Sequence, residues 1–279
     1  MSGPGESAVF APDALAGTVA LVTGGGTNLG KAAAAELARC GAEVVIAGRR
    51  EEVLAAAASE IGERCSWVSG DIREDAGARG IVETALERHG RLDFLLNNAG
   101  GQYFVPAEAI TDKGWRAVRR LNVGGTLRMC ELAHDLAMGP QRSGAIVNTT
   151  VSPHHGMPAM AHTGTARAAV EALSRELAER WAPEGVSVCA LAIGRFDTES
   201  LRKYPEQVWR GAARSVPLQR LGTLEEYGWM AALLATPLGR SFSGSVVTLD
   251  GGADNWWGPW PPEGVGDESG AVPIEERQR

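Results

Sequence analysis

A glycine-rich turn between an apolar run and an alanine-rich stretch constrains this chain more than any other feature. The run Val19 to Val22 leads into TGGGTNLG at Thr23 to Gly30, and the helix-forming stretch Lys31 to Cys40 follows at once. Glycines let the backbone turn tightly and approach a pyrophosphate, and the next helix presents unpaired N–H groups and the positive end of its dipole. The turn therefore predicts a dinucleotide site. The alternative is a tight strand-to-helix connection that holds no ligand.

Apolar runs with the length of buried strands recur along the whole chain. They are Val19 to Val22, Val44 to Ala47, Ser66 to Ser69, Phe94 to Leu96, Ala145 to Asn148, Val186 to Ala192 and Ser245 to Leu249. Stretches of helical period lie between them, several closed by glycine at Gly41, Gly62, Gly90 and Gly139 or Gly144. This alternation predicts an α/β fold: a single Rossmann-like, doubly wound, seven-stranded parallel sheet with helices on both faces.

Bulk properties narrow the class of protein. The 279 residues suffice for one large domain, and the net charge of −7 argues against nucleic-acid or membrane-surface partners, which need clustered positive charge. We predict a cytoplasmic protein, because the N-terminus lacks a targeting pattern and no 18 apolar residues occur in succession. The four cysteines lack CxxC spacing, so we expect no metal site.

Three segments are expected along the chain. Residues 1–16 are predicted to be a flexible arm, residues 17–252 the dinucleotide-binding domain, and residues 253–279 a tail rich in tryptophan and proline. The tail holds three of the eight tryptophans, at 256, 257 and 260, and rings of this size are rarely left in water. We expect them to pack on their own subunit, across a subunit interface or over the substrate mouth.

Side chains just after the predicted strands indicate which cofactor binds, since such sheets bind ligands at the carboxyl ends of their strands. Arg49 and Arg50 follow the second strand, where an NAD site would place an acidic residue for the ribose 2′-hydroxyl. Arginine instead suits a 2′-phosphate, so the pair predicts NADP(H), unless both are solvated side chains. Asp71-Ile72 after the third strand and NNAGG at 97–101 after the fourth complete the edge.

Over residues 17–252 the chain resembles the short-chain dehydrogenase/reductase family. The matching pieces are TGGGTNLG, GDI, NNAG, LNV at 121–123, IVNTT, IGRFDT and LDGG. Within the family, the pieces TGGGTNLGK, NNAGGQYFVPAE, GWRAV, AHTGTARAAVEAL and PLQRLGT are most similar to the trans-2-enoyl-CoA and 2,4-dienoyl-CoA reductase branch.

The resemblance implies how a cofactor would lie. The turn would hold the pyrophosphate, Arg49 the 2′-phosphate, and the later strand ends the adenine, ribose and nicotinamide carboxamide. The candidate cofactor residues are Gly24, Gly26, Thr27, Asn28, Leu29, Gly30, Arg49, Arg50, Asp71, Ile72, Asn98, Ala99, Gly100, Arg167, Ile193 and Thr198. Asn28 replaces the middle glycine of the family's turn, and asparagine tolerates positive φ better than most residues.

The catalytic positions depart from the family's Asn, Ser and Tyr-x-x-x-Lys. Here they read Asn122, Thr150, Thr163 and Arg167. The i, i+4 spacing keeps the last two on one helical face, but threonine cannot be tuned into an acid and arginine is a poor proton donor. Other candidate proton donors are His162 and, in the loop after the fifth strand, His154 and His155; Tyr103 is a further one. Each has a structural role as its alternative.

Reduction of a 2-enoyl thioester tolerates the missing tyrosine. Hydride adds to the β-carbon and charge collects on the thioester oxygen, where fixed donors stabilise it. We therefore expect an NADPH-dependent oxidoreductase acting on the C=C bond of such a thioester or a related enone. The alternatives are a carbonyl or alcohol oxidoreductase with a non-standard acid, and a cofactor-binding protein without turnover.

Two features bear on partners. Five basic residues, Arg202, Lys203, Arg210, Arg214 and Arg220, lie in the segment that covers the substrate in this family, and they suit the phosphates of an acyl-CoA or form a solvated face. The helices expected around 114–138 and 168–181 are rich in small and apolar residues. By resemblance they predict a homotetramer or homodimer.

Overall fold

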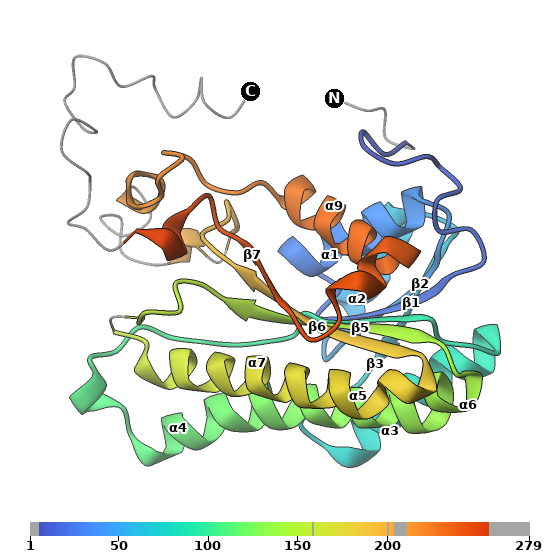
Figure 1. The fold of residues 1–279 in the computed structure, drawn as a ribbon, viewed down its shortest axis with the longest axis horizontal. Coiled ribbons are helices and arrows are strands. Elements are labelled where there is room, and N and C mark those ends of the chain that lie inside the picture. Colours follow the sequence, from blue (N-terminus) through green and yellow to red (C-terminus); the bar gives the residue numbers. More distant parts are fainter. Residues whose placement is uncertain (1–5, 158, 200, 204–210, 257–279) are drawn as a thin grey trace.

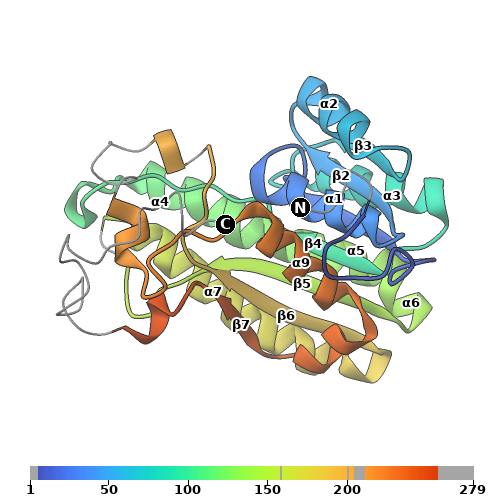
Figure 2. The ribbon, with the colours of Figure 1, turned by 90° about the horizontal axis from the view of Figure 1, so that it is seen from above.

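A single parallel sheet forms the centre of the molecule. The computed structural model describes residues 6–157, 159–199, 201–203 and 211–256. The strands are β1 (Val19–Thr23), β2 (Glu43–Gly48), β3 (Cys65–Ser69), β4 (Phe94–Asn97), β5 (Gly144–Val151), β6 (Val186–Ile193) and β7 (Val246–Leu249). They pair in parallel in the order β3-β2-β1-β4-β5-β6-β7, which leaves β3 and β7 at opposite edges (Figure 2). The predicted seven-stranded sheet is confirmed.

Helices cover both faces of the sheet. They are α1 (Asn28–Arg39), α2 (Glu51–Ile61), α3 (Asp75–His89), α4 (Asp112–Arg119), α5 (Thr126–Ala133), α6 (Gly139–Gln141), α7 (Ala161–Trp181) and α9 (Leu224–Ala235). Figure 1 shows α1 and α9 on one face and α4, α5 and α7 on the other. No helix in the described ranges is long and apolar enough to cross a membrane. Because both faces are covered, the strands are near-continuous apolar runs rather than alternating ones.

The long helix that precedes β5 continues past one of its predicted ends. Two π-helical segments, η2 (Arg120–Gly125) and η3 (His134–Met138), join α4, α5 and α6 end to end. Gly139 lies inside this helix, and the alternative stop, Gly144, is the first residue of β5; the helix ends at Gln141, and its C-cap residue Arg142 has φ of +50°. A Cβ at Gly139 would lie 3.0 Å from His134 Nε2, so this glycine permits close packing instead of ending the helix. The predicted stops at Gly41, Gly62 and Gly90 do have positive φ.

The strand order reverses between β1 and β4, and this reversal places the ligand crevice. The helix after β1 and the long helix after β4 cover opposite faces of the sheet, so the carboxyl ends of these two strands stay open between them. Thr23 lies opposite Asn97 in the register, which sets the glycine turn directly beside the NNAG segment. Two stretches more than 70 residues apart thus form one wall.

The predicted terminal segments are described only in part. Residues 6–16 precede β1, and Leu15 is buried while its N–H donates to the Cys40 carbonyl at 2.7 Å. At the other end, Trp256 is described, whereas Trp257 and Trp260 lie outside the described residues. The expectation that the tryptophans dock on a surface therefore stays a prediction.

Helix α1 approaches the glycine turn so closely that Gly30 has no room for a side chain. A Cβ there would lie 2.3 Å from the Gly24 carbonyl oxygen and 2.5 Å from Asn98 Nδ2. We expect Gly30→Ala to lower the free energy of unfolding by about 1–3 kcal/mol, as overpacking does. Urea denaturation measures the change.

Gly80→Ala is the matched control, since Gly80 is also helical and its added Cβ meets no atom within 4 Å. This variant should be stabilised by about 0.5–1 kcal/mol, the helix-propensity difference between the two residues. Equal urea midpoints for Gly30→Ala and the unmodified protein would contradict the close approach of α1.

Candidate active site

A cleft of about 940 Å³ opens at the carboxyl ends of the strands. Every residue predicted to contact the cofactor lines it, from Gly24 in the turn after β1 to Thr198 in the segment after β6. Of the predicted catalytic residues, Thr150 and Arg167 line it. Asn122, Thr163, His162 and His155 are not among the described residues that form its wall.

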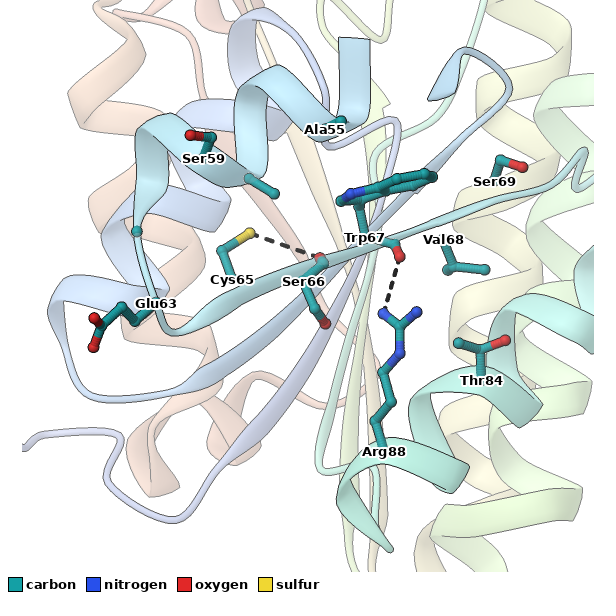
Figure 3. A pocket seen from close by; sticks show the side chains of 12 residues that line it. Ala55, Ser59, Glu63, Cys65, Ser66, Trp67, Val68, Ser69, Thr84 and Arg88 are labelled. Atoms are coloured by element: carbon teal, nitrogen blue, oxygen red, sulfur yellow. Dashed lines mark hydrogen bonds between the residues drawn. The ribbon is translucent and has the colours of Figure 1, made fainter. Parts of the chain in front are cut away.

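A second hollow, of about 880 Å³, lies beside the edge strand β3 (Figure 3). Its most prominent side chains are Trp67 of the strand and Arg88 of α3, and Arg88 Nη1 donates to the Trp67 carbonyl at 2.9 Å. Cys65 also lines it, but burial raises the pKa of this thiol to about 12, so it is protonated at neutral pH. None of the predicted cofactor or catalytic residues lines this hollow, so we assign the predicted cofactor and substrate sites to the larger cleft.

The glycine turn has the backbone that an anion site requires. Gly24 has φ of +65°, and Asn28 has φ of +44°, so the substituted position keeps a left-handed backbone. Helix α1 starts at Asn28, and the side chain of its N-cap residue, Thr27, caps none of the first N–H groups. No acidic side chain lies in the first turn. The N–H donors at this end are left for a ligand to accept.

The end of the cleft nearest β2 and β3 carries positive charge. Arg49 and Arg50 are exposed and line it directly after β2. Asp71 lines it too, but Arg73 Nε donates to both of its carboxylate oxygens, at 2.9 and 3.0 Å. These hydrogen bonds lower the pKa of Asp71 to about 2, so the carboxylate is ionised and already paired. A negatively charged group entering here meets two exposed guanidinium groups, although the charge of Arg49 also acts on Asp71.

A buried polar network holds the segment after β4 in place. Asn98 Nδ2 donates to the Thr23 carbonyl at 3.0 Å, and its Oδ1 accepts from the hydroxyl of Tyr227 at 3.2 Å. Tyr227 is fully buried on α9, and its hydroxyl also lies 2.8 Å from Thr149 Oγ1. Burial raises the pKa of this phenol, which keeps it a neutral donor. The network fixes Asn98, which lines the cleft, against the glycine turn.

Arg167 places a charged group at the opposite end of the cleft. Its Nη1 donates to the Thr149 carbonyl at 2.7 Å, and its Nε has no partner among the described residues. A Cβ at Gly100 would lie 2.3 Å from Nη2, so the guanidinium fits only because residue 100 is glycine. Burial lowers the pKa of Arg167 to about 10, and the group remains cationic at neutral pH.

Asn122 acts on the backbone rather than on the cleft. It lies in the π-helical segment η2, where its Nδ2 donates to the carbonyls of Gly101 at 2.8 Å and Val118 at 3.1 Å. Its Oδ1 accepts from the Gly101 N–H at 3.1 Å. The amide therefore ties the loop after β4 to the helix, and π-helical turns of this kind are frequent at functional sites.

The remaining candidates of the catalytic set are engaged with protein neighbours or buried. Thr163 is fully buried and its hydroxyl has no hydrogen-bond partner in the described ranges. His162 is buried edge-on against Tyr103, with ring centroids 4.4 Å apart, and burial lowers its pKa. Thr150 Oγ1 donates to Glu171 at 2.9 Å instead of pointing at a ligand. His155 lies 3.8 Å from Asp254 in the loop after β5.

The predicted basic patch is partly neutralised. Arg220 forms a two-point ion pair with Glu226, and Arg202 lies 3.4 Å from Asp197. Arg214 is described and exposed. Arg210 lies outside the described residues, as does the side chain of Lys203.

Several residues of the site were not expected from the sequence. Tyr227 and Thr149 carry no motif, because a tyrosine in an apolar helix and a threonine in a buried strand are ordinary core residues. Glu171 had a usable signal: it is four residues after Arg167 on α7 and therefore shares the buried face. Arg195, exposed at the rim of the cleft after β6, is a further unexpected lining residue.

Comparison with known proteins agrees with this architecture. Residues 25–254 match the family model described as Enoyl-(Acyl carrier protein) reductase. The chain belongs to the short-chain dehydrogenase/reductase family.

Relatives of known name lie in the branch suggested by the motifs. Peroxisomal 2,4-dienoyl-CoA reductase of Danio rerio is 33% identical, over 88% of this chain and 84% of the relative. A probable 2,4-dienoyl-CoA reductase of Bacillus subtilis is 33% identical, over 86% of this chain and 97% of the relative. Among solved structures, a citronellol catabolism dehydrogenase of Pseudomonas aeruginosa PAO1 superposes with a TM-score of 0.80 and 34% identity, over 89% of this chain and 99% of that chain.

The hydroxyl of Tyr227 should contribute measurably to stability through its two hydrogen bonds. Tyr227→Phe leaves the side-chain amide oxygen of Asn98 without its donor and the buried Thr149 hydroxyl without its acceptor, so we expect the free energy of unfolding to fall by about 1–3 kcal/mol. Adding Thr149→Val removes a second unpaired group and should recover part of that loss. Urea denaturation of both single variants and the double variant measures the coupling, and strictly additive losses would show that the network is not coupled.

Proposed function

We propose that this protein is an NADP(H)-dependent reductase of the C=C bond in a 2-enoyl thioester, with an acyl-CoA as substrate. The observation that carries the proposal is the division of one cleft into two chemically distinct ends. One end offers an uncapped helix N-terminus and two exposed arginines, and the other offers a guanidinium that is charged at neutral pH, with no tyrosine among the described residues that line the cleft. The similarity to 2,4-dienoyl-CoA reductases supports the choice of thioester.

The cleft fits the dinucleotide at each of its parts. Gly30 lets α1 pack against the turn at Gly24, so the free N–H groups at the start of α1 face the cleft, where they would donate hydrogen bonds to a pyrophosphate. Arg49 would bind the 2′-phosphate, since arginine forms paired charge-assisted hydrogen bonds with phosphate. The unpaired Nε of Arg167 suits a ribose hydroxyl. The bound nicotinamide would supply the hydride.

At the reacting end, the residues of this chain have electrostatic and positioning roles. The Arg167 cation favours negative charge as it develops on the thioester oxygen, and its charge does not change near neutral pH. Asn122 holds Gly101 and so keeps the neighbouring wall at Gly100 open for the guanidinium. The α-carbon then takes its proton from water, because His162 is buried behind the wall and its pKa is lowered.

Carbonyl reduction is the second candidate, and the similarity to a citronellol catabolism dehydrogenase favours it. That reaction forms an alkoxide, which is far more basic than an enolate and needs a tuned acid at the oxygen. Among the residues that line the described cleft, Thr150 and Arg167 occupy the family's serine and lysine positions, and neither is such an acid. The thioester reaction therefore makes the smaller demand on this site.

Turnover separates the candidates. With NADPH, we expect crotonyl-CoA and longer 2-enoyl-CoA or 2,4-dienoyl-CoA esters to be reduced, followed by loss of cofactor absorbance at 340 nm. Ketones and aldehydes should give no comparable rate. Arg167→Ala should lower kcat by about 100-fold or more, the usual cost of removing one donor to a developing oxyanion. Arg175→Ala, an exposed change on the same helix, is the control. Activity on carbonyls alone would overturn the proposal, and silence on all substrates would favour a binding protein.

Cofactor choice depends on Arg49. Arg49→Ala should weaken NADPH binding by about 1.5–3 kcal/mol, the range for hydrogen bonds to charged groups, and should leave NADH binding nearly unchanged. Titration of the quenching of protein fluorescence gives both dissociation constants. Equal losses for the two cofactors would show that Arg49 does not contact the 2′-phosphate.

A further inference from the structure

An imidazole ring lies between two carboxylates in the loop after β5. His154 Nε2 is 2.8 Å from Glu171 Oε1 on α7, and His154 Nδ1 is 2.6 Å from Asp254 Oδ2 in the short helix η8 (Ala253–Asn255). The side chain of Glu171 is only 7% exposed and that of Asp254 is 21% exposed. The His154 side chain is 32% exposed, so solvent screens its contact with the buried Glu171 less than its contact with Asp254.

Both carboxylates are also linked to the wall of the cleft. The Glu171 oxygen that faces His154 accepts a hydrogen bond from Thr150 Oγ1 at 2.9 Å. The Asp254 N–H donates to Asp250 Oδ2 at 2.7 Å, and the same Asp250 oxygen accepts from Ser152 Oγ at 2.6 Å. Thr150 and Ser152 line the cleft. The imidazole thus closes a ring of contacts that joins β5, its following loop, α7 and the segment after β7.

Only the doubly protonated imidazole satisfies both contacts. A neutral ring has one N–H, so one nitrogen lone pair would face a carboxylate. Partial burial disfavours the charged ring, but the hydrogen bond that the ring donates to Asp254 and the charge of Glu171 outweigh it and raise the pKa of His154. The other titratable groups nearby are His155, 3.8 Å from Asp254, and Asp250, which interacts with Arg195.

We propose that His154 is a positioning residue, which bridges Glu171 and Asp254 as a cation and so holds the loop at 152–157 in the shape that forms the substrate end of the cleft. Ser152, Pro153, Gly156 and Met157 of this loop line the cleft, whereas the His154 ring does not. The effect on substrate rests on the function proposed above. The effect on the loop does not.

The sign of the pH dependence follows from the direction of the shift. A group whose pKa is raised by folding stabilises the folded form fully below its unfolded pKa, and this contribution is lost as the pH rises through the folded pKa. The bridge is therefore complete below the ordinary histidine pKa of about 6.5, and it is lost as the pH rises through the raised pKa of His154. Above the pKa of His154 one of its two hydrogen bonds is lost, so the loop loosens and KM for the thioester rises while Kd for NADPH stays constant.

Hydrogen exchange on the full chain tests the bridge without any turnover. In His154→Gln, amide exchange of peptides covering 150–157 should be about tenfold faster than in the unmodified protein at the same pH, since one charge-assisted hydrogen bond is lost. His134→Gln is the matched control, because His134 also lies between two carboxylates, Asp135 at 2.7 Å and Glu184 at 3.3 Å, but before the start of β5. It should leave exchange at 150–157 unchanged. Unchanged exchange in His154→Gln, or equal acceleration in both variants, would overturn the proposal.

Kinetics then test the link to substrate. KM for crotonyl-CoA should be about tenfold higher in His154→Gln, with kcat within a factor of two, and should no longer depend on pH in the range where the unmodified protein's KM rises. A KM and pH profile equal to those of the unmodified protein would refute the link. If no thioester is turned over by any form of the protein while exchange at 150–157 still responds to His154→Gln, the proposed function fails and the bridge stands.

Discussion

The contact between Gly30 and the Gly24 carbonyl oxygen is the constraint on which the rest of the structure depends. At this contact α1 lies against the turn after β1 with no side chain between them. The start of α1 therefore faces the crevice between β1 and β4, where the strand order reverses. Asn98 fits into the same corner, and Tyr227 and Thr149 fix it there from α9 and β5. One backbone contact thus sets the relative positions of two strands, two helices and the deepest part of the cleft.

The fold could be predicted from the sequence because each strand corresponds to a short apolar run of neighbouring residues. Each of the seven predicted strands differs from the observed one by at most three residues at either end, as Ala145 to Asn148 against β5 shows. Buried parallel strands are continuous apolar runs, and such runs are hard to mistake. The prediction that a helix ends at Gly139 is wrong because the sequence alone does not distinguish a glycine within a helix from a glycine that follows it. In the structure, the close approach of His134 shows that Gly139 is needed for packing within the helix.

The residues of the candidate site could be predicted only where a motif groups residues that are close in sequence. The glycine turn, Arg49 and the segment at 97–101 each follow a strand, so the rule on strand ends located them. Sequence spacing could not show that the Thr150 hydroxyl turns toward Glu171 or that His162 is enclosed by Tyr103, because both contacts join different elements. Tyr227 is 129 residues from its partner Asn98 and carries no pattern that links the two.

The hydrogen bond from Arg88 to the Trp67 carbonyl, shown in Figure 3, affects how readily the edge of the sheet can pair with a strand of another molecule. Strand β3 is an edge of the sheet, and an edge strand offers unpaired backbone groups to any extended segment of another chain. A long cationic side chain that occupies one of these carbonyls blocks the hydrogen-bond ladder at its middle residue. Another strand would have to displace that arginine before it could pair along the whole of β3, so this hydrogen bond opposes edge-to-edge pairing of two sheets.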